Sequence, residues 1–517
     1  MMTSQTHSAP HPSIQLSRRG RWAAVAVLAA SLLVIMMDMT ILNIAIPDMA
    51  AELTPTSTQQ LWIVDIYSLV LAGLLVSWAA IADRWGRKRM LMLGYALFGG
   101  ASLLVLFAES AEAVIAIRAL LGVGGAMIMP TTLSLIRVIF TDAKERATAL
   151  SIWAAVSGLG AAIGPLAGGF LLEHFSWHAA FLINVPLMVG ALIAGFLLLP
   201  ESRVPNPGRW DALAALLSLV GMTLLVWSIK TFGKEATLAA PEAWIALAGA
   251  VVTLGWFGLR CVRSDHPLLE LRLFNSRPFS AGMIAALGST FAMVAALLLL
   301  AQWMQLVDGA SPLEAGLRLT PMAIASAVAS VSAPPLARLI GARAVVAGGV
   351  GVAGIGMITI GITPGTLALP IVLIALVLIG AGAGSLAIAS AMVMANSPEE
   401  KAGNAGALEE TSYELGAVLG VAILGSISAI LYRAEFATGT AFTGLDPALG
   451  LEAQESLGAA IAISGEAGLP DLATEAGVAF THSMQTTGLI GGSLMIAVAA
   501  VVFCVTPKGT QVSGGSH

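Results

Sequence analysis

The sequence predicts an all-α protein that crosses a membrane fourteen times. The chain has 517 residues, of which 57% are hydrophobic and 11% are charged, and its mean hydropathy is +0.88. Soluble domains carry about 25% charged residues, so this composition excludes a soluble enzyme. The apolar residues gather in runs of about 20 or more, the length that a helix needs to cross the hydrocarbon core of a bilayer.

Fourteen such runs follow one another along the chain. We expect spans at 22–46, 58–82, 90–108, 112–136, 146–172, 178–200, 210–230, 243–261, 278–306, 313–338, 343–362, 367–394, 403–432 and 484–504. Arg18, Arg19 and Arg21 lead directly into the first run, which therefore predicts a spanning helix and not a cleaved signal.

The distribution of basic residues supports this number of spans. With the N-terminus inside, 20 of the 25 Lys and Arg lie at cytoplasmic ends, as the positive-inside rule requires. One span more or fewer would move the later basic loops outside. Arg118 lies within a span, and Lys230, Lys234, Arg318 and Arg433 lie at expected outer ends. We therefore expect both termini in the cytoplasm.

The spans divide into two bundles with an insertion between them. We expect a cytoplasmic tail at 1–21, a six-helix bundle at 22–200, a linker with two inserted helices at 201–277, a second six-helix bundle at 278–504 and a tail at 505–517. A weak repeat relates residues 82–88 to residues 337–343, and two related halves are typical of transporters with a substrate site between them. The acidic outer loop 434–483 forms either a small cap that gathers cations or a solvated coil.

Three acidic residues stand out in the thirteenth span, between Gly403 and Arg433. On a helix, Glu409 shares a face with Tyr413, while Glu410 and Glu414 stack one turn apart on a neighbouring face. A carboxylate at the bilayer centre costs about 2.5–3.5 kcal/mol on insertion scales. The three acids either face a wet cavity that binds cations or protons, or lie solvated in the headgroup layer.

Two more acids lie in apolar runs, Asp38 in the first span and Asp65 in the second. Loss of water disfavours a charged carboxylate, whereas a bound cation favours it. Proton and cation therefore exclude each other from one carboxylate, which is a physical basis for antiport. Trp62 and Tyr67 offer aromatic faces suited to organic cations, although Trp62 alone fits an interface anchor equally well.

Arg118 is a third charged group in an apolar run. An arginine within a span needs a carboxylate or carbonyl partner, or it snorkels outward from near the start of its helix.

Two glycine-containing stretches predict moving parts. In the loop of Asp83, Arg84, Gly86 and Arg87, the glycine permits a sharp turn. Its charges either pair with a helix end in one conformation only, or act as a topology anchor.

The fifth span carries the second stretch, with Gly160, Gly164, Pro165, Gly168 and Gly169. The spaced glycines permit close helix contact and the proline bends the helix. This pattern fits either a hinge between two access states or plain small-residue packing.

Together these motifs resemble the major facilitator superfamily, specifically its fourteen-helix drug:proton antiporters. The matching stretches are 33–47, 83–88, 118–126, 160–169 and 181–186, with Ala79 where a glycine is usual and Leu121 where glutamine is common. The run from Glu409 to Tyr413 looks most like the QacA-type quaternary-ammonium exporters. Such exporters can carry an acid deep in the tenth span. Here the only acid of that span is Glu314, near its outer start.

The resemblance implies a proton-coupled exporter of lipophilic cationic drugs, dyes and quaternary ammonium biocides in the bacterial cytoplasmic membrane. It assigns Asp38, Arg118 and Glu410 to proton coupling, although the proton carrier among the three glutamates stays open. It assigns a second set to cation binding, namely Asp65, Glu409, Glu414, Trp62, Tyr67 and Tyr413. We expect a monomer driven by the proton gradient, with no cofactor, no metal and no nucleic acid.

Two alternatives remain at this point. One is a dedicated exporter of a single metabolite or antibiotic with the same fold. The other is a membrane receptor or scaffold, which is less favoured because such a protein has no use for embedded acids. The choice between monovalent and divalent cations also stays open.

Overall fold

The computed structural model describes residues 17–140, 142–203, 210–235, 239–264, 267–363, 365, 367–398 and 402–510. The helices of the first half are α1 (Arg18–Leu53), α2 (Ser57–Trp85), α3 (Arg87–Leu104), η1 (Val105–Phe107), α4 (Ala111–Ile139), α5 (Ala143–His174), α6 (Ala179–Leu182), α7 (Asn184–Leu198), α8 (Ala212–Glu235) and α9 (Pro241–Arg263). Those of the second half are η2 (Leu271–Asn275), α10 (Arg277–Leu306), α11 (Pro312–Ile340), α12 (Ala342–Gly361), α13 (Leu369–Ala383), α14 (Leu386–Ala395), α15 (Ala402–Gly420), η4 (Val421–Gly425), α16 (Ser426–Phe436), α17 (Thr440–Thr443), α18 (Pro447–Glu455), α19 (Leu457–Ala467) and α20 (Pro470–Val505).

The all-helical membrane fold is confirmed. Thirteen helical segments in the described part of the chain are long and apolar enough to span a bilayer. Helix α5, with 32 residues, packs along α1 and α11 and completes the fourteen expected spans. Three expected spans are interrupted. Ile183 separates α6 from α7, Gly384 and Ser385 separate α13 from α14, and the π-helical segment η4 joins α15 to α16.

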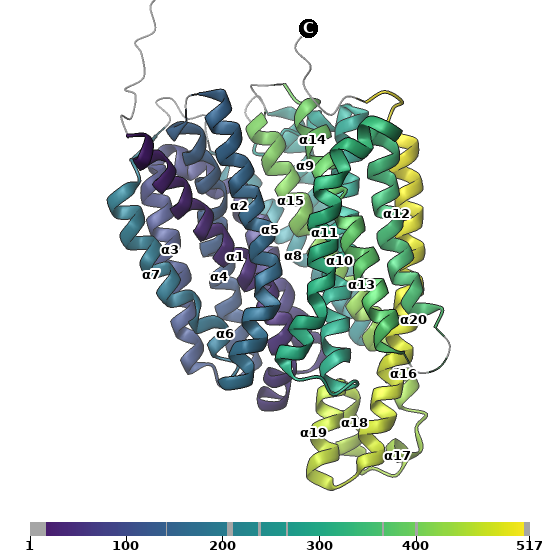
Figure 1. Cartoon of the computed structure of the whole chain (residues 1–517). Coiled ribbons are helices and arrows are strands. Elements are labelled where there is room, and N and C mark those ends of the chain that lie inside the picture. The colour runs from purple at the N-terminus through teal and green to yellow at the C-terminus, as the bar shows by residue number, and fades with distance from the viewer. Residues whose placement is uncertain are drawn as a thin grey trace, which may run out of the picture.

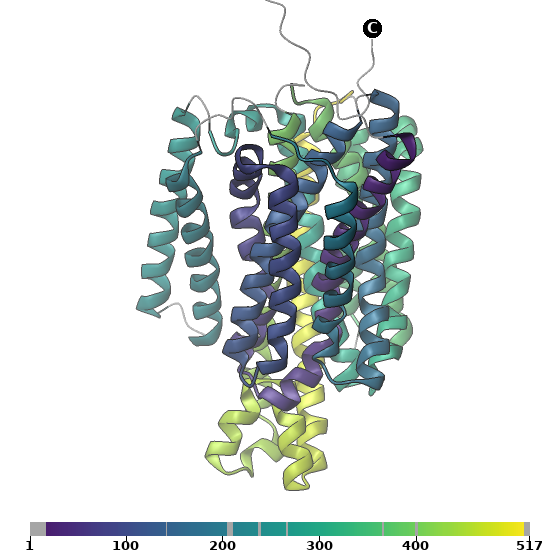
Figure 2. The same ribbon diagram turned by 90° about the vertical axis from the view of Figure 1, so that its left-hand side faces the viewer.

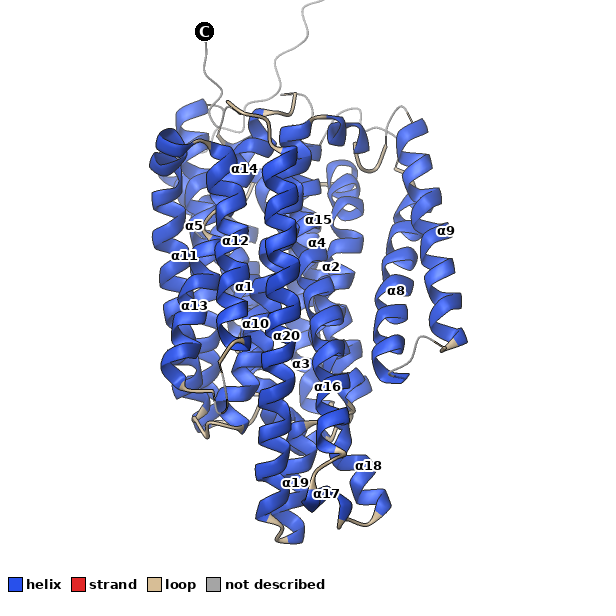
Figure 3. Ribbon diagram, turned by 90° about the vertical axis from the view of Figure 1, so that its right-hand side faces the viewer, coloured by secondary structure: helices blue, strands red, loops and turns tan. Residues whose placement is uncertain are grey.

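The helices form two bundles that lie side by side (Figure 1). Helices α1 to α7 make the first, and α10 to α16 with α20 make the second. The α8–α9 hairpin lies at one side of the two bundles, with α9 outermost (Figures 2 and 3). Helix α8 packs on α2 of the first bundle and on α16 of the second, whereas α9 packs mainly on α8. Apolar residues of α9 such as Val251 and Val252 are exposed, as lipid-facing residues are.

The two ends of the molecule differ. The described chain enters and leaves at one end, which also carries the loop of Asp83 and Arg87, and we call it the basic end (Figure 1). The opposite end carries α17, α18, α19 and the start of α20, and we call it the cap end.

The stretch 434–483 is therefore helical and not a solvated coil. Glu475 of α20 accepts hydrogen bonds from the backbone amides of Thr440 and Ala441, each at 3.0 Å to Oε1, and so caps the start of α17. Helix α19 packs on α1, where Gly458 approaches Ala50. The short helices thus contact both bundles.

Candidate functional site

Asp38 and Arg118 form a buried ion pair inside the first bundle. Arg118 Nη1 lies 2.8 Å from Asp38 Oδ2, and each side chain is about 1–2% exposed. Asn184 Nδ2, at the start of α7, donates to Asp38 Oδ1 at 2.6 Å. Arg118 Nε donates to the Ile63 carbonyl of α2 at 3.1 Å. The structure thus places Arg118 beside Asp38 and gives the guanidinium the carboxylate and carbonyl partners that a buried arginine needs.

Tyr67 belongs to this same buried group. The Arg118 guanidinium carbon lies 4.5 Å from the centre of the Tyr67 ring, and Tyr67 is fully buried. In this conformation its aromatic face meets a cation of the protein itself. Its assignment to substrate binding stays a prediction.

Asp65 has an internal cation as well, and here one sequence expectation is wrong. Lys230 was expected at the outer end of its span, but its side chain is fully buried and its Nζ lies 2.9 Å from Asp65 Oδ2. The same ammonium lies 4.1 Å from the centre of the Trp62 ring. The reason for the difference is that α8 continues to Glu235 and packs against α2, which takes Lys230 into the protein. Trp62 and Asp65 thus enclose a lysine in this conformation.

The end of α8 is held from the other side by the second bundle. Arg433 of α16 donates to the carbonyls of Lys234 at 2.8 Å and Gly233 at 2.6 Å. These are among the last carbonyls of α8, which have no partner within the helix. A cation at a helix C-terminus also interacts favourably with the helix dipole. Helix α8 is therefore attached to the first bundle by Lys230 and to the second by Arg433.

The three acids of α15 lie in different environments. Tyr413 donates a hydrogen bond of 2.5 Å to Glu409, which also interacts with Ser390 of α14. Glu414 is 3% exposed and interacts with Ser68 of α2, while its Oε2 has no hydrogen-bond partner among the described residues. Glu410, by contrast, lines a cavity. The expected position of Glu409 and Tyr413 on one face of the helix is thus confirmed. Glu409 and Glu414 are buried, so the alternative in which these acids are solvated in the headgroup layer does not fit them.

The cavity opens between the bundles in the half of the molecule nearer the basic end. Its volume is about 440 Å³. Its charged lining residues come from α2, α3, α4, α15 and the start of α8, namely Asp83, Arg87, Arg137, Asp211 and Glu410. A ligand or a proton that enters this cavity can therefore reach Glu410 before the more buried acids.

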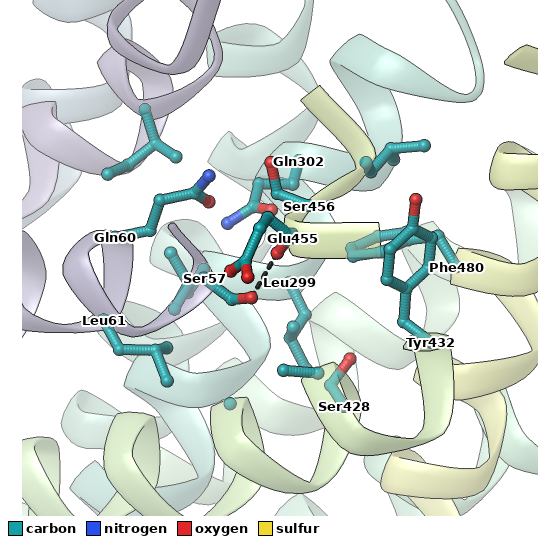
Figure 4. A pocket seen from close by; sticks show the side chains of 15 residues that line it. Ser57, Gln60, Leu61, Leu299, Gln302, Ser428, Tyr432, Glu455, Ser456 and Phe480 are labelled. Atoms are coloured by element: carbon teal, nitrogen blue, oxygen red, sulfur yellow. Dashed lines mark hydrogen bonds between the residues drawn. The ribbon is translucent and has the colours of Figure 1, made fainter. Parts of the chain in front are cut away.

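The cap end is closed by comparison. A small pocket of about 50 Å³ lies there, between α2, α10, α16 and the α18–α19 junction (Figure 4). The Ser57 hydroxyl donates to the Glu455 carbonyl across it, as the dashed line shows (Figure 4). Gln305 of α10 donates to the Ile44 carbonyl of α1 at 3.2 Å, which also joins the bundles. The described conformation is therefore open towards the basic end.

The glycines of α5 permit close packing within the first bundle and, at Gly169, against the second. Gly160, Gly164 and Gly168 lie against α1, so that an added Cβ would collide with Leu33, Thr40 and Ile41 respectively. Gly169 lies against α11, where an added Cβ would meet the Pro312 carbonyl oxygen at 2.6 Å.

The contact between α5 and α11 is reciprocal. A Cβ on Gly316 of α11 would collide with the carbonyl oxygen of Pro165. Helix α5 therefore packs closely on both bundles, and the proline does not interrupt it.

The loop between α2 and α3 docks on the segment that follows α7. Asp83 and Arg87 form an ion pair of 2.8 Å, and Gly86 has φ +124°, a value that favours glycine. The Arg87 amide donates to the Ser202 carbonyl at 2.9 Å. Arg84 lies in the last turn of α2. A conformational role of this loop stays a prediction.

Sequence reasoning missed the roles of Lys230 and Asn184, and the serines that contact the α15 acids. For Asn184 a signal was present, because a buried amide within an apolar segment needs a polar partner. For Lys230 the signal was a lysine next to an apolar run. That pattern is equally typical of a helix end in the headgroup layer, so it does not identify a buried lysine.

These features define a polytopic membrane transporter: two helical bundles that carry buried charges and have a cavity between them. The family model of the Major Facilitator Superfamily matches residues 28–421, and the chain belongs to this family. It is a transporter and not an enzyme.

Curated relatives agree with this. The chain is 40% identical over 495 residues to the multidrug efflux pump LfrA of Mycolicibacterium smegmatis, covering 95% of this chain and 97% of the relative. It is 36% identical over 446 residues to the methyl viologen resistance protein SmvA of Salmonella typhimurium, covering 84% and 86% respectively. A bacterial homologue of the human lysosomal transporter Spinster, solved in an inward-facing and unoccupied conformation, has a TM-score of 0.66 and 17% identity, over 95% of this chain and 98% of that one. That likeness concerns the fold alone.

Proposed function

We propose that the protein is a proton-coupled antiporter that exports lipophilic organic cations, among them drugs, dyes and quaternary ammonium biocides. The observation that carries this proposal is the acidic cluster of α15. Glu410 lines the cavity between the bundles, Glu414 interacts with Ser68 of the first bundle, and Glu409 is buried nearby on the same helix. No lysine or arginine in the described part of the chain pairs with any of the three.

This charge imbalance fits exchange. Unneutralised carboxylates in a site with little water favour either a proton or a cation. When a lipophilic cation enters from the basic end, it replaces the proton, and when a proton arrives from the other side, it releases the cation. The names of the relatives support the direction and the substrate class, because LfrA is a multidrug efflux pump and SmvA confers methyl viologen resistance.

The basic end is the cytoplasmic face in this proposal, so both termini are cytoplasmic and the cap end faces outward. The basis is the positive-inside rule. The Asp38–Arg118 pair lies within one bundle, where it supports the coupling site. The protein acts as a monomer in a bacterial cytoplasmic membrane, without a cofactor.

A second candidate is a dedicated exporter of one antibiotic. The observation in its favour is a relative of 32% identity, the tetracenomycin C resistance and export protein of Streptomyces glaucescens, over 83% of this chain and 80% of that one. A single-substrate exporter would move one compound and ignore structurally unrelated cations.

Flux measurements in proteoliposomes test both candidates. Purified protein is reconstituted, a pH gradient is imposed, and uptake of tetraphenylphosphonium and of an unrelated cationic dye is followed. We expect uptake of both, and its loss when an ionophore collapses the gradient. The matched control is the E409Q/E410Q/E414Q triple variant. Uptake that persists without the gradient contradicts proton coupling, and uptake of neither cation contradicts multidrug export.

A further inference from the structure

Lys230 is a charged residue buried within the membrane-spanning helix α8, which is unusual. Its side chain is fully buried, its ammonium lies 2.9 Å from the Asp65 carboxylate, and it lies 4.1 Å from the Trp62 ring centre. An unpaired lysine at membrane depth is energetically costly, so the pairing with Asp65 is what makes this position tolerable.

The surroundings of this ammonium have the chemistry of an organic-cation site. A carboxylate supplies the opposite charge, and an indole face supplies the attraction of its π-electrons for a cation. The occupant of this site is the protein's own Lys230, carried on the inserted helix α8.

The pairing of Asp65 with Lys230 also limits which acids are free to bind a cationic substrate. In the described part of the chain, five acids lie deep in the spans. Asp38 is paired with Arg118 and Asp65 with Lys230, and the three acids without such a partner in the described chain all lie on α15. The cationic substrate therefore meets free carboxylates from the second bundle only.

Asp65 is nevertheless close to that cluster. Ser68, three residues after Asp65 on α2, interacts with Glu414 of α15. Residues three apart on a helix lie on one face with Cβ atoms about 5–6 Å apart. Without the lysine charge, Asp65 would add a second free carboxylate, from the first bundle, next to the one that Glu414 supplies.

We propose that Lys230 is a specificity-determining residue, a tethered cation that withdraws Asp65 from substrate binding and thereby favours monovalent over divalent cations. This rests on the proposed function as a cation exporter. Asp65 pairs with a dication's second charge only when Lys230 is absent or displaced. The alternative is a purely structural pair that anchors α8 to α2, which affects all substrates alike.

Equilibrium binding to the purified full-length protein, with no pH gradient, separates these two roles. The probes are tetraphenylphosphonium, a monovalent cation, and methyl viologen, a dication. We expect Lys230→Met, which keeps the length and apolar stem of the side chain, to raise the ratio of methyl viologen to tetraphenylphosphonium affinity by about tenfold, or about 1.4 kcal/mol. Lys230→Arg keeps the charge and is expected to keep the wild-type ratio.

The double variant D65N/K230M removes both charges and is expected to restore the wild-type ratio. If K230M alone does not fold, the single variant D65N decides. It leaves the lysine charge unpaired, and we expect it to weaken methyl viologen binding more than tetraphenylphosphonium binding, with recovery on adding K230M. Equal losses for both probes in every variant overturn the proposal in favour of a structural pair.

The wild type serves as the control for the underlying function. If it binds both probes but shows no pH-driven flux, proton coupling fails while the Lys230 inference is still decided by the ratios. If it binds neither probe, cation export fails and the inference fails with it.

Discussion

Arg118 and Asp38 are joined across two helices by a 2.8 Å contact, and Asn184 holds the second carboxylate oxygen at 2.6 Å. The pair is almost without solvent exposure. Removing one partner of a buried ion pair leaves an uncompensated charge, at a cost of about 3–5 kcal/mol. The pair thus fixes α1, α4 and α7 relative to one another.

We expect Arg118→Ala to abolish transport at normal expression. Arg118→Lys should retain little, because an ammonium cannot reproduce the separate guanidinium contacts to Asp38 and the Ile63 carbonyl. Efflux of a fluorescent cation from intact cells measures this, with membrane protein level checked in parallel. Arg89→Ala is the matched control, because Arg89 is exposed and its ion pair with Glu201 is long, at 3.7 Å. Full activity of the alanine variant would show that the buried pair is not needed for transport.

Glu410→Gln should stop pH-driven efflux of every substrate, because a glutamine cannot release a proton from the cavity wall. Glu409→Gln and Glu414→Gln should instead weaken individual cations, by about tenfold or about 1.4 kcal/mol, because each removes one carboxylate from a redundant cluster. The measurement is uptake of a fluorescent cation into inverted vesicles across a pH gradient.

The outcome also orders the three acids. Normal efflux by Glu410→Gln together with a complete loss in Glu414→Gln would reverse the assignment within the pair. Two carboxylates one turn apart can share a proton, so the double variant belongs in the same series. If all three single variants export normally, coupling must lie with Asp38 and Arg118.

Gly316→Val should open the cap end. An added side chain there collides with the Pro165 carbonyl of α5, and overpacking costs about 1–3 kcal/mol. That cost corresponds to a shift of about 5- to 150-fold between two states. The readout is labelling of a cysteine placed at Gln302, in the cap-end pocket (Figure 4), by an impermeant maleimide in a background without Cys261 and Cys504.

Gly190→Val is the matched control for that experiment. Gly190 lies in α7, and an added Cβ would meet nothing within 4 Å. It should leave the labelling rate unchanged. Equal labelling of wild type and Gly316→Val would mean that the α5–α11 contact does not hold the cap end closed.

The orientation is tested by reporter fusions. Fusions after Glu235 and after Gly468 should report the outside, and a fusion after Ser202 should report the cytoplasm. This follows from placing the basic end inside. A cytoplasmic signal at Glu235 or Gly468 would contradict the proposed orientation.

Asp211, at the start of α8, should make the stability of the first turn of that helix depend on pH. Partial burial raises the pKa of its carboxyl, but the hydrogen bond from Arg260 and that from the Ala214 amide outweigh this, so the pKa lies below its ordinary value of 3.8. A lowered pKa in the folded protein contributes stability above the unfolded value, and that contribution disappears as the pH falls through the folded value. Protection of the first turn of α8 from hydrogen exchange should therefore be constant between about pH 5 and 7 and decline only at a pH below about 4.

Asp211→Ala should remove that protection at neutral pH, with a loss of about 1 kcal/mol, typical of a helix cap. Asp211→Asn keeps an acceptor for the Ala214 amide and should retain part of it without the pH dependence. Unchanged exchange in Asp211→Ala would show that the side chain does not stabilise this turn.

The fold was predictable because spanning helices can be recognised from the length of their apolar runs and from the basic residues at their cytoplasmic ends. Runs of about 20 apolar residues and the bias of Lys and Arg indicated the spans, and the acids of the thirteenth span indicated the candidate site, whose function stays a prediction. What hydropathy cannot give is the depth and rotation of a helix. Lys230 was misplaced for that reason, since its partner Asp65 lies on a distant helix and only the packing of α8 on α2 joins them.

The choice between a cap and a solvated coil for 434–483 could not be made from the sequence, for a different reason. Its helices are short, and isolated helices of that length are marginal in water. They form here because α20 and α1 support them, as the contacts of Glu475 with Thr440 and of Gly458 with Ala50 show. Tertiary support of this kind leaves no periodic signal in an alanine- and glycine-rich stretch.

Helix α20 gives the cap end a mechanical connection to the second bundle. With 36 residues at about 1.5 Å each it is about 54 Å long, whereas the hydrocarbon core is about 30 Å thick. More than 20 Å of continuous helix therefore projects beyond that core as a rigid lever arm, at about 1.5 Å per residue. A tilt of about 10° in the second bundle would move its tip by about 4 Å, so a probe fixed to the α19–α20 corner would report a movement of that bundle from the cap end.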